Sequence, residues 1–237
     1  MKNKEVIYQH LGTREYAECW QYQEKLMKEI IDIKLSNREK EIPVSTQNYL
    51  LTVEHPHVYT LGKSGKENHL LVSDEFLKSI NASYFKVNRG GDITYHGYGQ
   101  LVVYPILDLE NFFTDIHKYV RYLEEVIIRT LAEYDIKAER SKGETGVWLD
   151  VNSPNARKIC AIGVRSSRWV TMHGLAFNIN VDLRYFNYIV PCGIVDKKVT
   201  SLNKELGYNV DENEVRMKVL RHFEEVFECN IVEKLKT

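Results

Sequence analysis

Residues 157–180 read RKICAIGVRSSRWVTMHGLAFNIN, and this stretch decides the fold. It contains two runs in which apolar side chains alternate with others, 158–165 and 169–180, separated by only a few residues. Alternation with a period of two is typical of a β-strand, and so short a connection favours an antiparallel hairpin. The stretch therefore predicts two adjacent antiparallel strands.

Strands and helices alternate outward from this hairpin. Further strands are expected at 5–10, 48–53, 84–87, 101–107 and 146–149. Helices are expected after Thr13, after Ser73, after Thr114 and after Asp211, the last with Glu214 completing a capping box. The stretch 55–71 contains glycines and few periodic apolar residues, so a long loop is expected there.

Because strands arrive both as hairpins and after helices, we expect an α+β fold rather than a doubly wound parallel sheet. Its sheet would be mixed and largely antiparallel, flanked by helices that we place on one side. With no internal repeat or linker apparent, residues 1–237 are expected to form a single domain.

The charge and hydropathy of the sequence indicate which binding partners and which cellular compartment to expect for the protein. Lys and Arg number 32 against 33 Asp and Glu, a net charge of −1, which argues against a nucleic-acid partner held through its phosphates. We see no apolar run of membrane-spanning length, and the first ten residues, MKNKEVIYQH, lack a signal-peptide core. We therefore expect a cytoplasmic protein without membrane contact.

In that compartment the four cysteines should be reduced, and their wide spacing argues against a zinc ribbon or a C-x-x-C redox site. Cys19 falls on a helix stripe, Cys160 inside a strand and Cys229 at a helix end. Cys192 instead lies in a Pro-Cys-Gly turn, where a thiol is accessible. Cys192 is therefore the best candidate nucleophile.

A second candidate segment is the glycine-dense stretch 89–100, RGGDITYHGYGQ. Its four glycines allow the backbone to approach a ligand closely, although a plain tight turn would use them too. Arg89 and His96 favour a binding loop, because a turn does not require them. The stretch matches neither a P-loop nor a dinucleotide fingerprint.

Lys158 opens an otherwise apolar strand and is the candidate partner of the thiol. Such a lysine is either a solvated edge residue or a buried one whose pKa falls on burial. Small residues at 161–163 and 174–176 would leave room for an apolar ligand, or would serve close strand packing.

The chain resembles the lipoyl(octanoyl) transferases through several motifs in fixed order. They are EHPHVYTLG (54–62), RGGDITYHGYGQLVVYPI (89–106), TGVW (145–148), KICAIGVR (158–165), MHGLAFNIN (172–180), IVPCGI (189–194) and VTSL (199–202). The resemblance implies transfer of an octanoyl group from octanoyl-acyl carrier protein to a lysine of a lipoyl domain. It also implies a biotin/lipoate protein ligase catalytic fold, and neither a cofactor nor a metal. The acceptors would be proteins such as the glycine cleavage H protein and 2-oxoacid dehydrogenase E2 subunits.

The resemblance also assigns roles to individual residues. It places the acyl-thioester cysteine on Cys192 and the lysine that tunes it on Lys158. The implied substrate-binding residues are Arg89, Gly90, Gly91, Asp92, Ile93, Thr94, Tyr95, His96, Ala161, Ile162, Gly163, Gly174, Leu175 and Ala176. One departure stands out: Tyr98 occupies the family's usual proline position, which frees φ and leaves the turn less preorganised.

Two other functions are compatible with parts of this pattern. An ATP-dependent lipoate or biotin protein ligase of the same fold would need a nucleotide site and no cysteine. A non-catalytic module that binds acylated carrier or lipoyl domains would need the glycine-rich loop but not Cys192.

Overall fold

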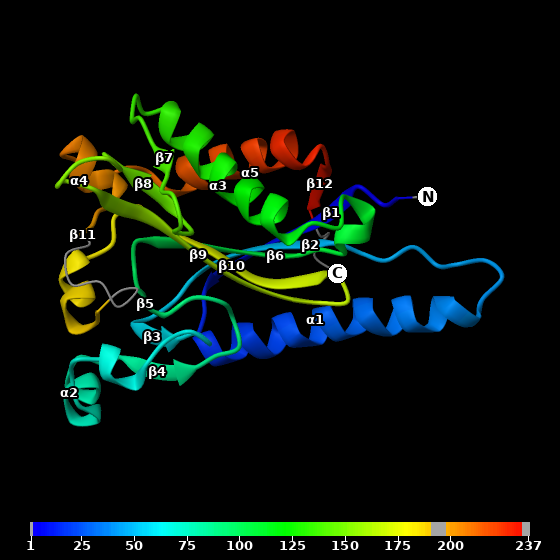
Figure 1. Ribbon diagram of the computed structural model, residues 1–237, viewed down its shortest axis with the longest axis horizontal. Helices are drawn as coiled ribbons and strands as arrows, with labels where there is room; N and C mark the ends of the chain where they lie inside the picture. The colour runs from blue at the N-terminus through cyan, green and yellow to red at the C-terminus, as the bar shows by residue number, and fades with distance from the viewer. Residues whose placement is uncertain (1, 191–197, 234–237) are drawn as a thin grey trace.

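The computed structural model describes residues 2–190 and 198–233. In this part of the chain nine strands form one large mixed sheet (Figure 1). They are β1 (Glu5–Thr13), β2 (Tyr49–Glu54), β6 (Gln100–Ile106), β7 (Glu139–Arg140), β8 (Val147–Leu149), β9 (Arg157–Ser167), β10 (Val170–Asn178), β11 (Lys198–Val199) and β12 (Asn230–Glu233). The order is β12-β1-β2-β6-β10-β9-β8-β7, with β11 also paired to β9. The expected α+β architecture with a mixed sheet is confirmed.

A smaller sheet lies beside the large one. Its order is β4-β3-β5, formed by β3 (Val58–Leu61), β4 (Ser83–Lys86) and β5 (Ile93–His96). The prediction of a long loop over 55–71 is therefore wrong in part, because β3 lies inside it. β3 is only four residues long and buried throughout, so it shows no alternation of apolar and polar residues.

Helices cover both faces of the large sheet, not one as expected (Figure 1). The described helices are α1 (Tyr16–Ser36), α2 (Asp74–Ser79), α3 (Ile116–Ala132), α4 (Leu202–Leu206) and α5 (Glu212–Phe227), with short 3₁₀ turns at Asn37–Glu39, Glu67–His69, Leu109–Asn111 and Leu183–Tyr188. On β6, Leu101 and Val103 pack in the core with α3 and α5, whereas Val102 and Tyr104 pack in the core with α1. This alternation follows from the two-residue period of a strand. Both faces of β6 are apolar because both are covered.

The predicted hairpin of β9 and β10 is confirmed. The strands pair antiparallel from Val170 with Ser167 to Phe177 with Cys160. Arg168 and Trp169 form the two-residue turn with φ values of 50° and 64°. Positive φ at both positions matches the right-handed twist of a hairpin, although glycine and asparagine adopt it with less strain.

Helix starts agree with the sequence in some places and differ in others. Ser73 caps α2 as predicted, and Asp211 accepts hydrogen bonds at the start of α5. Glu214 does not complete the expected capping box but pairs with Lys218 at 2.8 Å. Thr13 ends β1 and donates its hydroxyl hydrogen to Glu54 instead of capping α1.

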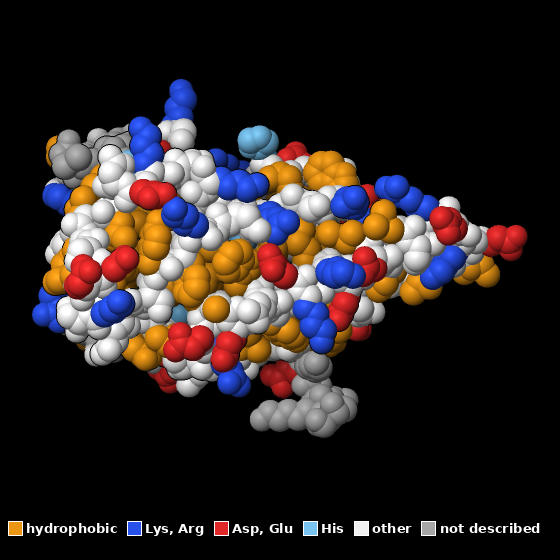
Figure 2. Space-filling model, turned by 90° about the horizontal axis from the view of Figure 1, so that it is seen from below, with side chains coloured by type: hydrophobic (Ala, Val, Ile, Leu, Met, Phe, Trp, Pro, Cys, Tyr) orange, Lys and Arg blue, Asp and Glu red, His pale blue; other side chains and the backbone are white. Residues whose placement is uncertain are grey.

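Charged side chains of both signs are interspersed over the face that carries α1 and α2 (Figure 2). This mixture matches the near-zero net charge of the sequence. Among the helices of the described ranges, none has the length and apolar character that a membrane crossing requires.

Candidate active site

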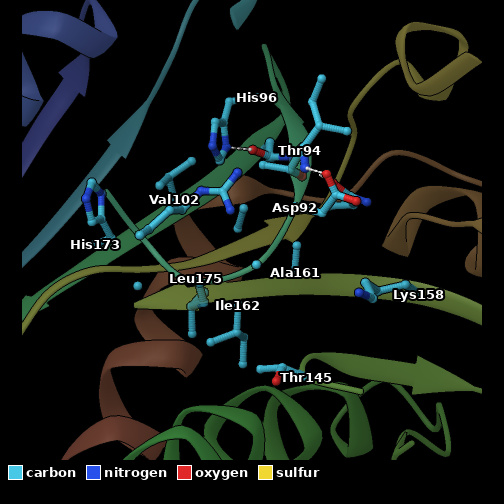
Figure 3. A pocket seen from close by; sticks show the side chains of 18 of the residues that line it. Asp92, Thr94, His96, Val102, Thr145, Lys158, Ala161, Ile162, His173 and Leu175 are labelled. Carbon is cyan, nitrogen blue, oxygen red and sulfur yellow. Dashed lines mark hydrogen bonds between the residues drawn. The ribbon is translucent and has the colours of Figure 1, made fainter. Parts of the chain in front are cut away.

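A cavity of about 420 Å³ lies between the large sheet and the glycine-rich stretch 89–100. Its floor comes from β9 and β10, and its opposite wall comes from the segment that leads into β5 (Figure 3). All but two of the predicted site residues within the described ranges line this cavity. They are Arg89, Gly91, Asp92, Ile93, Thr94, His96, Lys158, Ala161, Ile162, Gly163, Gly174, Leu175 and Ala176.

The two exceptions have structural places instead. The backbone N–H of Gly90 donates to the carbonyl of Val164 at 2.9 Å, which ties the glycine-rich segment to β9. Tyr95 is fully buried in the small-sheet core, where its hydroxyl lies 2.7 Å from Nδ1 of His57. Its ring therefore packs away from the cavity that Thr94 and His96 line.

Arg89 anchors the cavity wall. Its Nη2 donates to the backbone oxygen of Thr60 at 2.6 Å and to the Thr60 hydroxyl at 2.8 Å. Asp92 accepts from the backbone N–H of Ile93 at 2.6 Å and lies 2.7 Å from Nδ1 of His69. Gly91 has a φ of 85°, which a residue with a side chain adopts only under strain. These contacts fix the loop against the small sheet.

The glycines of the floor allow close approach of backbone segments. A Cβ on Gly163 would meet the carbonyl oxygen of Gly90 at 2.9 Å, and one on Gly174 would collide with Val103 of β6. Gly174 therefore serves close strand packing. Ala161 and Ala176, which pair across β9 and β10, supply apolar surface on the cavity side, whereas the side chains of Ile162 and Leu175 pack in the core with α3 (Figure 3).

A β-bulge turns Lys158 into the cavity. Val147 pairs with Cys160, but the next residue of β8, Trp148, pairs with Lys158, so Ile159 is an extra residue in β9. Ile159 and Cys160 both pack in the core with α3, whereas Lys158 lies on the cavity side. Bulges commonly redirect a side chain in this way next to functional sites.

Backbone pairing on both sides holds Lys158 in place. β9 pairs with Trp148 of β8 on one side and with Val199 of β11 on the other. The ammonium of the half-buried Lys158 lies 4.6 Å from the centre of the Trp148 ring, a cation–π contact. Lys158 is therefore neither a freely solvated edge residue nor fully buried.

A chain of buried hydrogen bonds crosses the floor beside these residues. His96 Nδ1 lies 2.8 Å from Oε1 of Gln100, an acceptor, so Nδ1 carries the hydrogen. Gln100 in turn donates to Asn178 at 2.9 Å, and Asn178 donates to the carbonyl of Thr200 at 2.9 Å. The network joins β5, β6 and β10 to the residue after β11.

Three buried histidines stay neutral near pH 7. Burial is the main cause in each case and lowers the pKa of His55 to about 4 and the pKa values of His96 and His173 to about 3. Nearby His55 adds to the effect on His96. At neutral pH, His96 organises the loop through its hydrogen bond and is a very weak base.

The turn at Tyr98 is held without proline. Gly99 has a φ of 79°, and a Cβ there would meet the backbone of Asn180 at 2.6 Å. The Gly99 N–H donates to Glu54 at 2.8 Å, and the N–H of Gln100 donates to Gly97 at 3.2 Å. Tyr98 is half exposed and packs edge-on against His57.

The inner end of the cavity is formed by residues that the sequence does not mark as functional. Tyr16 of α1, Tyr104 of β6 and His173 of β10 line it. Tyr16 stacks on His96 with ring centres 5.9 Å apart. An aromatic residue on the apolar stripe of a helix or within a buried strand looks the same in the sequence whether it lines a cavity or packs in the core.

The described thiols are poor nucleophiles. Burial raises the pKa of Cys19 to about 11 and that of Cys229 to about 12, and it raises the pKa of the fully buried Cys160 further. The predicted nucleophile, Cys192, lies outside the described residues. Within residues 2–190 and 198–233, no group of three or more His, Cys, Asp and Glu side chains is placed to hold a metal ion.

Comparison with known proteins identifies related sequences over most of the chain. The model of the lipoyl protein ligase A/B catalytic domain matches residues 15–224. An octanoyltransferase from Christiangramia forsetii is 61% identical over 97% of this chain and 98% of its own length. An octanoyltransferase from Flavobacterium johnsoniae is also 61% identical, over 97% of this chain and all of its own.

Solved structures share the fold at low sequence identity. One, from an archaeal lipoylation system of Thermoplasma acidophilum, is a bi-partite lipoate protein ligase and its E2 lipoyl domain. It superposes with a TM-score of 0.69 at 18% identity, covering 100% of this chain and 88% of that one. Lipoate-protein ligase A bound with ATP gives a TM-score of 0.68 at 15% identity, covering 99% and 90%. At these identities the likeness establishes the fold alone.

Proposed function

The chain belongs to the lipoyl protein ligase A/B catalytic domain family, and from that premise we propose that it is an octanoyltransferase. It takes the octanoyl group from octanoyl-acyl carrier protein and transfers it to a lysine of a lipoyl domain. The observation that carries this proposal is the 61% identity to octanoyltransferases across nearly the whole chain. The acceptors are lipoyl domains of proteins such as the glycine cleavage H protein and 2-oxoacid dehydrogenase E2 subunits.

The cavity supports an acyl substrate. Its volume of about 420 Å³ falls within the usual range for small-ligand sites, about 300–1,000 Å³. Lys158 lies at one end, and Ala161, Ala176 and Val102 supply apolar surface further along the cavity (Figure 3). An alkyl chain can therefore lie on apolar surface with its carbonyl carbon near the ammonium.

We assign the nucleophile to Cys192. The other three thiols all have raised pKa values, so few of them ionise at neutral pH. A thiolate is the reactive form of cysteine, and a nearby ammonium stabilises it. Lys158, the lysine that the fold brings into the cavity, supplies that ammonium.

The reaction then has two acyl-transfer steps. The Cys192 thiolate attacks the donor carbonyl, and the bond from that carbonyl carbon to the carrier's sulfur breaks. The carrier leaves as a thiol, because its sulfur takes a proton from the Lys158 ammonium, and Lys158 becomes neutral. The acceptor lysine amine next attacks the new thioester, an amide forms, and the Cys192 thiolate leaves again. Lys158, in its neutral form at that moment, takes the proton that the attacking amine loses.

Mass spectrometry of the intact protein tests this assignment. Mixing the protein with octanoyl-acyl carrier protein should add the mass of one octanoyl group, and Cys192→Ala should abolish the adduct. Cys160→Ala is the matched control, because Cys160 is buried on the α3 side of β9 and should leave the adduct unchanged.

An adduct that persists in Cys192→Ala would refute the nucleophile assignment. A parallel reaction with free octanoate, ATP and the lipoyl domain, but without carrier protein, separates the transferase from a ligase. Octanoylated lipoyl domain formed under those conditions would overturn the proposed function.

A further inference from the structure

His173 lines the inner end of the acyl cavity, and the polar groups of Trp20 and Gln23 lie next to it. His173 lies at this end, far from Lys158 (Figure 3). His173 Nδ1, Gln23 Nε2 and Trp20 Nε1 are all buried, and none has a hydrogen-bond partner within the described ranges. Because buried polar atoms are nearly always satisfied by protein or ordered water, this group indicates a binding site.

The three side chains form one cluster. Trp20 and Gln23 are three residues apart in α1 and therefore share a face of the helix. Gln23 Oε1 accepts the backbone N–H of His173 at 2.9 Å, and the rings of Trp20 and His173 have centres 6.5 Å apart. The two elements thus bring the three atoms to the same place.

Backbone strain helps to build this cluster. Met172 already points to the α1 side of β10, so regular alternation would send the next side chain to the other face. His173 instead has a φ of 58°, and its side chain contacts Asn88 and Trp20 on the α1 side. A left-handed, non-glycine residue inside a buried strand is a rare feature that the surrounding structure must hold in place.

The hydrogen-bonding character of the three atoms is complementary to water. His173 Nε2 lies 3.0 Å from Oδ1 of Asn88, an acceptor, so Nε2 carries the hydrogen and Nδ1 is an acceptor. Burial lowers the pKa of His173 to about 3, which keeps the ring neutral. Gln23 Nε2 and Trp20 Nε1 are donors. One water molecule can accept from both and donate to Nδ1.

We propose that Trp20, Gln23 and His173 hold an ordered water molecule that closes the inner end of the acyl cavity and disfavours chains longer than octanoyl. The inference rests on the proposed octanoyltransferase function, because it concerns the length of that acyl group. A longer chain would displace the water and leave three buried polar atoms without a hydrogen-bond partner. A site whose polar groups are left unpaired by the wrong substrate discriminates strongly against it.

Trp20→Phe tests the water site, because it removes the indole N–H and opens space. The readout is the ratio of kcat/KM with decanoyl-acyl carrier protein to kcat/KM with octanoyl-acyl carrier protein. We expect this ratio to rise about tenfold in Trp20→Phe, the discrimination typical of one or two methylenes. Trp169→Phe is the matched control at the exposed hairpin tip and should leave the ratio unchanged.

Two further measurements test the water site independently of Trp20→Phe. Gln23→Met removes the second donor and should also raise the ratio, which covers the case in which Trp20→Phe does not fold. A crystal structure of the unmodified protein should show a water oxygen within about 3.2 Å of at least two of the three atoms. An unchanged ratio in a variant that still transfers octanoyl, or a dry site in the crystal, would overturn the inference. Failure of the unmodified protein to transfer octanoyl would instead overturn the proposed function, and the crystal would still decide the water site.

Discussion

Lys158 is the residue on which the proposed chemistry can be tested most directly. Lys158→Met keeps the length of the side chain and removes the ammonium. A positioned acid–base group contributes about 100-fold to 10,000-fold, so we expect octanoyl transfer to slow by at least about 100-fold. The fold should persist, because the residue is held by backbone pairing with β8 and β11.

Lys78→Met is the matched control, since Lys78 is an exposed lysine of α2 outside the cavity. Single-turnover transfer to a lipoyl domain and circular dichroism would be measured on both variants. Unchanged transfer in Lys158→Met would contradict the role given to this residue.

The hairpin of β9 and β10 supports a prediction about stability. Its turn places Trp169 at a φ of 64°, where a residue with a Cβ is strained by about 1–2 kcal/mol relative to glycine. We therefore expect Trp169→Gly to have a higher free energy of unfolding than Trp169→Ala by about 1 kcal/mol. Both variants remove the same indole, so the difference reports the backbone alone.

Ser166, an exposed residue of β9, provides the control for the same pair of substitutions. Its φ is not positive, so Ser166→Gly should be less stable than Ser166→Ala. Urea unfolding of the four variants measures both differences. The same order of stability at both positions would argue against strain in the turn.

These elements also show how far the sequence predicts the fold. The β9–β10 hairpin follows from alternation, and α3 follows from its 3.6-residue apolar stripe. The stripe of α1 shows that the helix has an apolar face but not which side of the sheet it covers. The bulge at Ile159 cannot be read from the sequence, because one extra apolar residue does not alter the composition of the strand.

Some residues of the candidate site can be identified from the sequence and others cannot. The glycine-rich segment and Lys158 were identified because their residue types are unusual for a turn and for a core strand. The cluster of Gln23 and His173 was not, because it joins residues 150 positions apart through one hydrogen bond. A contact between residues so far apart in the sequence forms only when the sheet assembles, so no short sequence pattern predicts it.

The three buried histidines give the whole molecule a predictable response to acid. In the unfolded chain a histidine takes up a proton near pH 6.5, whereas His55, His96 and His173 stay neutral in the folded chain down to about pH 4 or 3. Between these values the unfolded state binds more protons, so stability falls as pH decreases. Each histidine contributes about 1.4 kcal/mol per pH unit below about pH 6.

Urea unfolding at about pH 7 and about pH 5 measures this loss. His55→Gln should flatten the pH dependence by about one proton, because a glutamine cannot titrate. His117→Gln, at an exposed position of α3, should leave the slope as it is. Equal slopes in the two variants would show that burial does not suppress protonation of His55.

The single extra residue in β9 decides where this strand can change in length and still present its active face. Lys158 and Cys160 face opposite sides of the sheet although they are two positions apart, because Ile159 lies between them as the bulge residue. Deleting Ile159 would make the two residues neighbours in a regular strand, where they would still face opposite sides, so the amine of Lys158 would stay in the cavity. Deleting Ala161 instead would keep the bulge and reverse the side of every residue before it, so that the same amine would point into the apolar layer under α3. Loss of one codon should therefore be tolerated at the bulge and should inactivate the protein two codons further on.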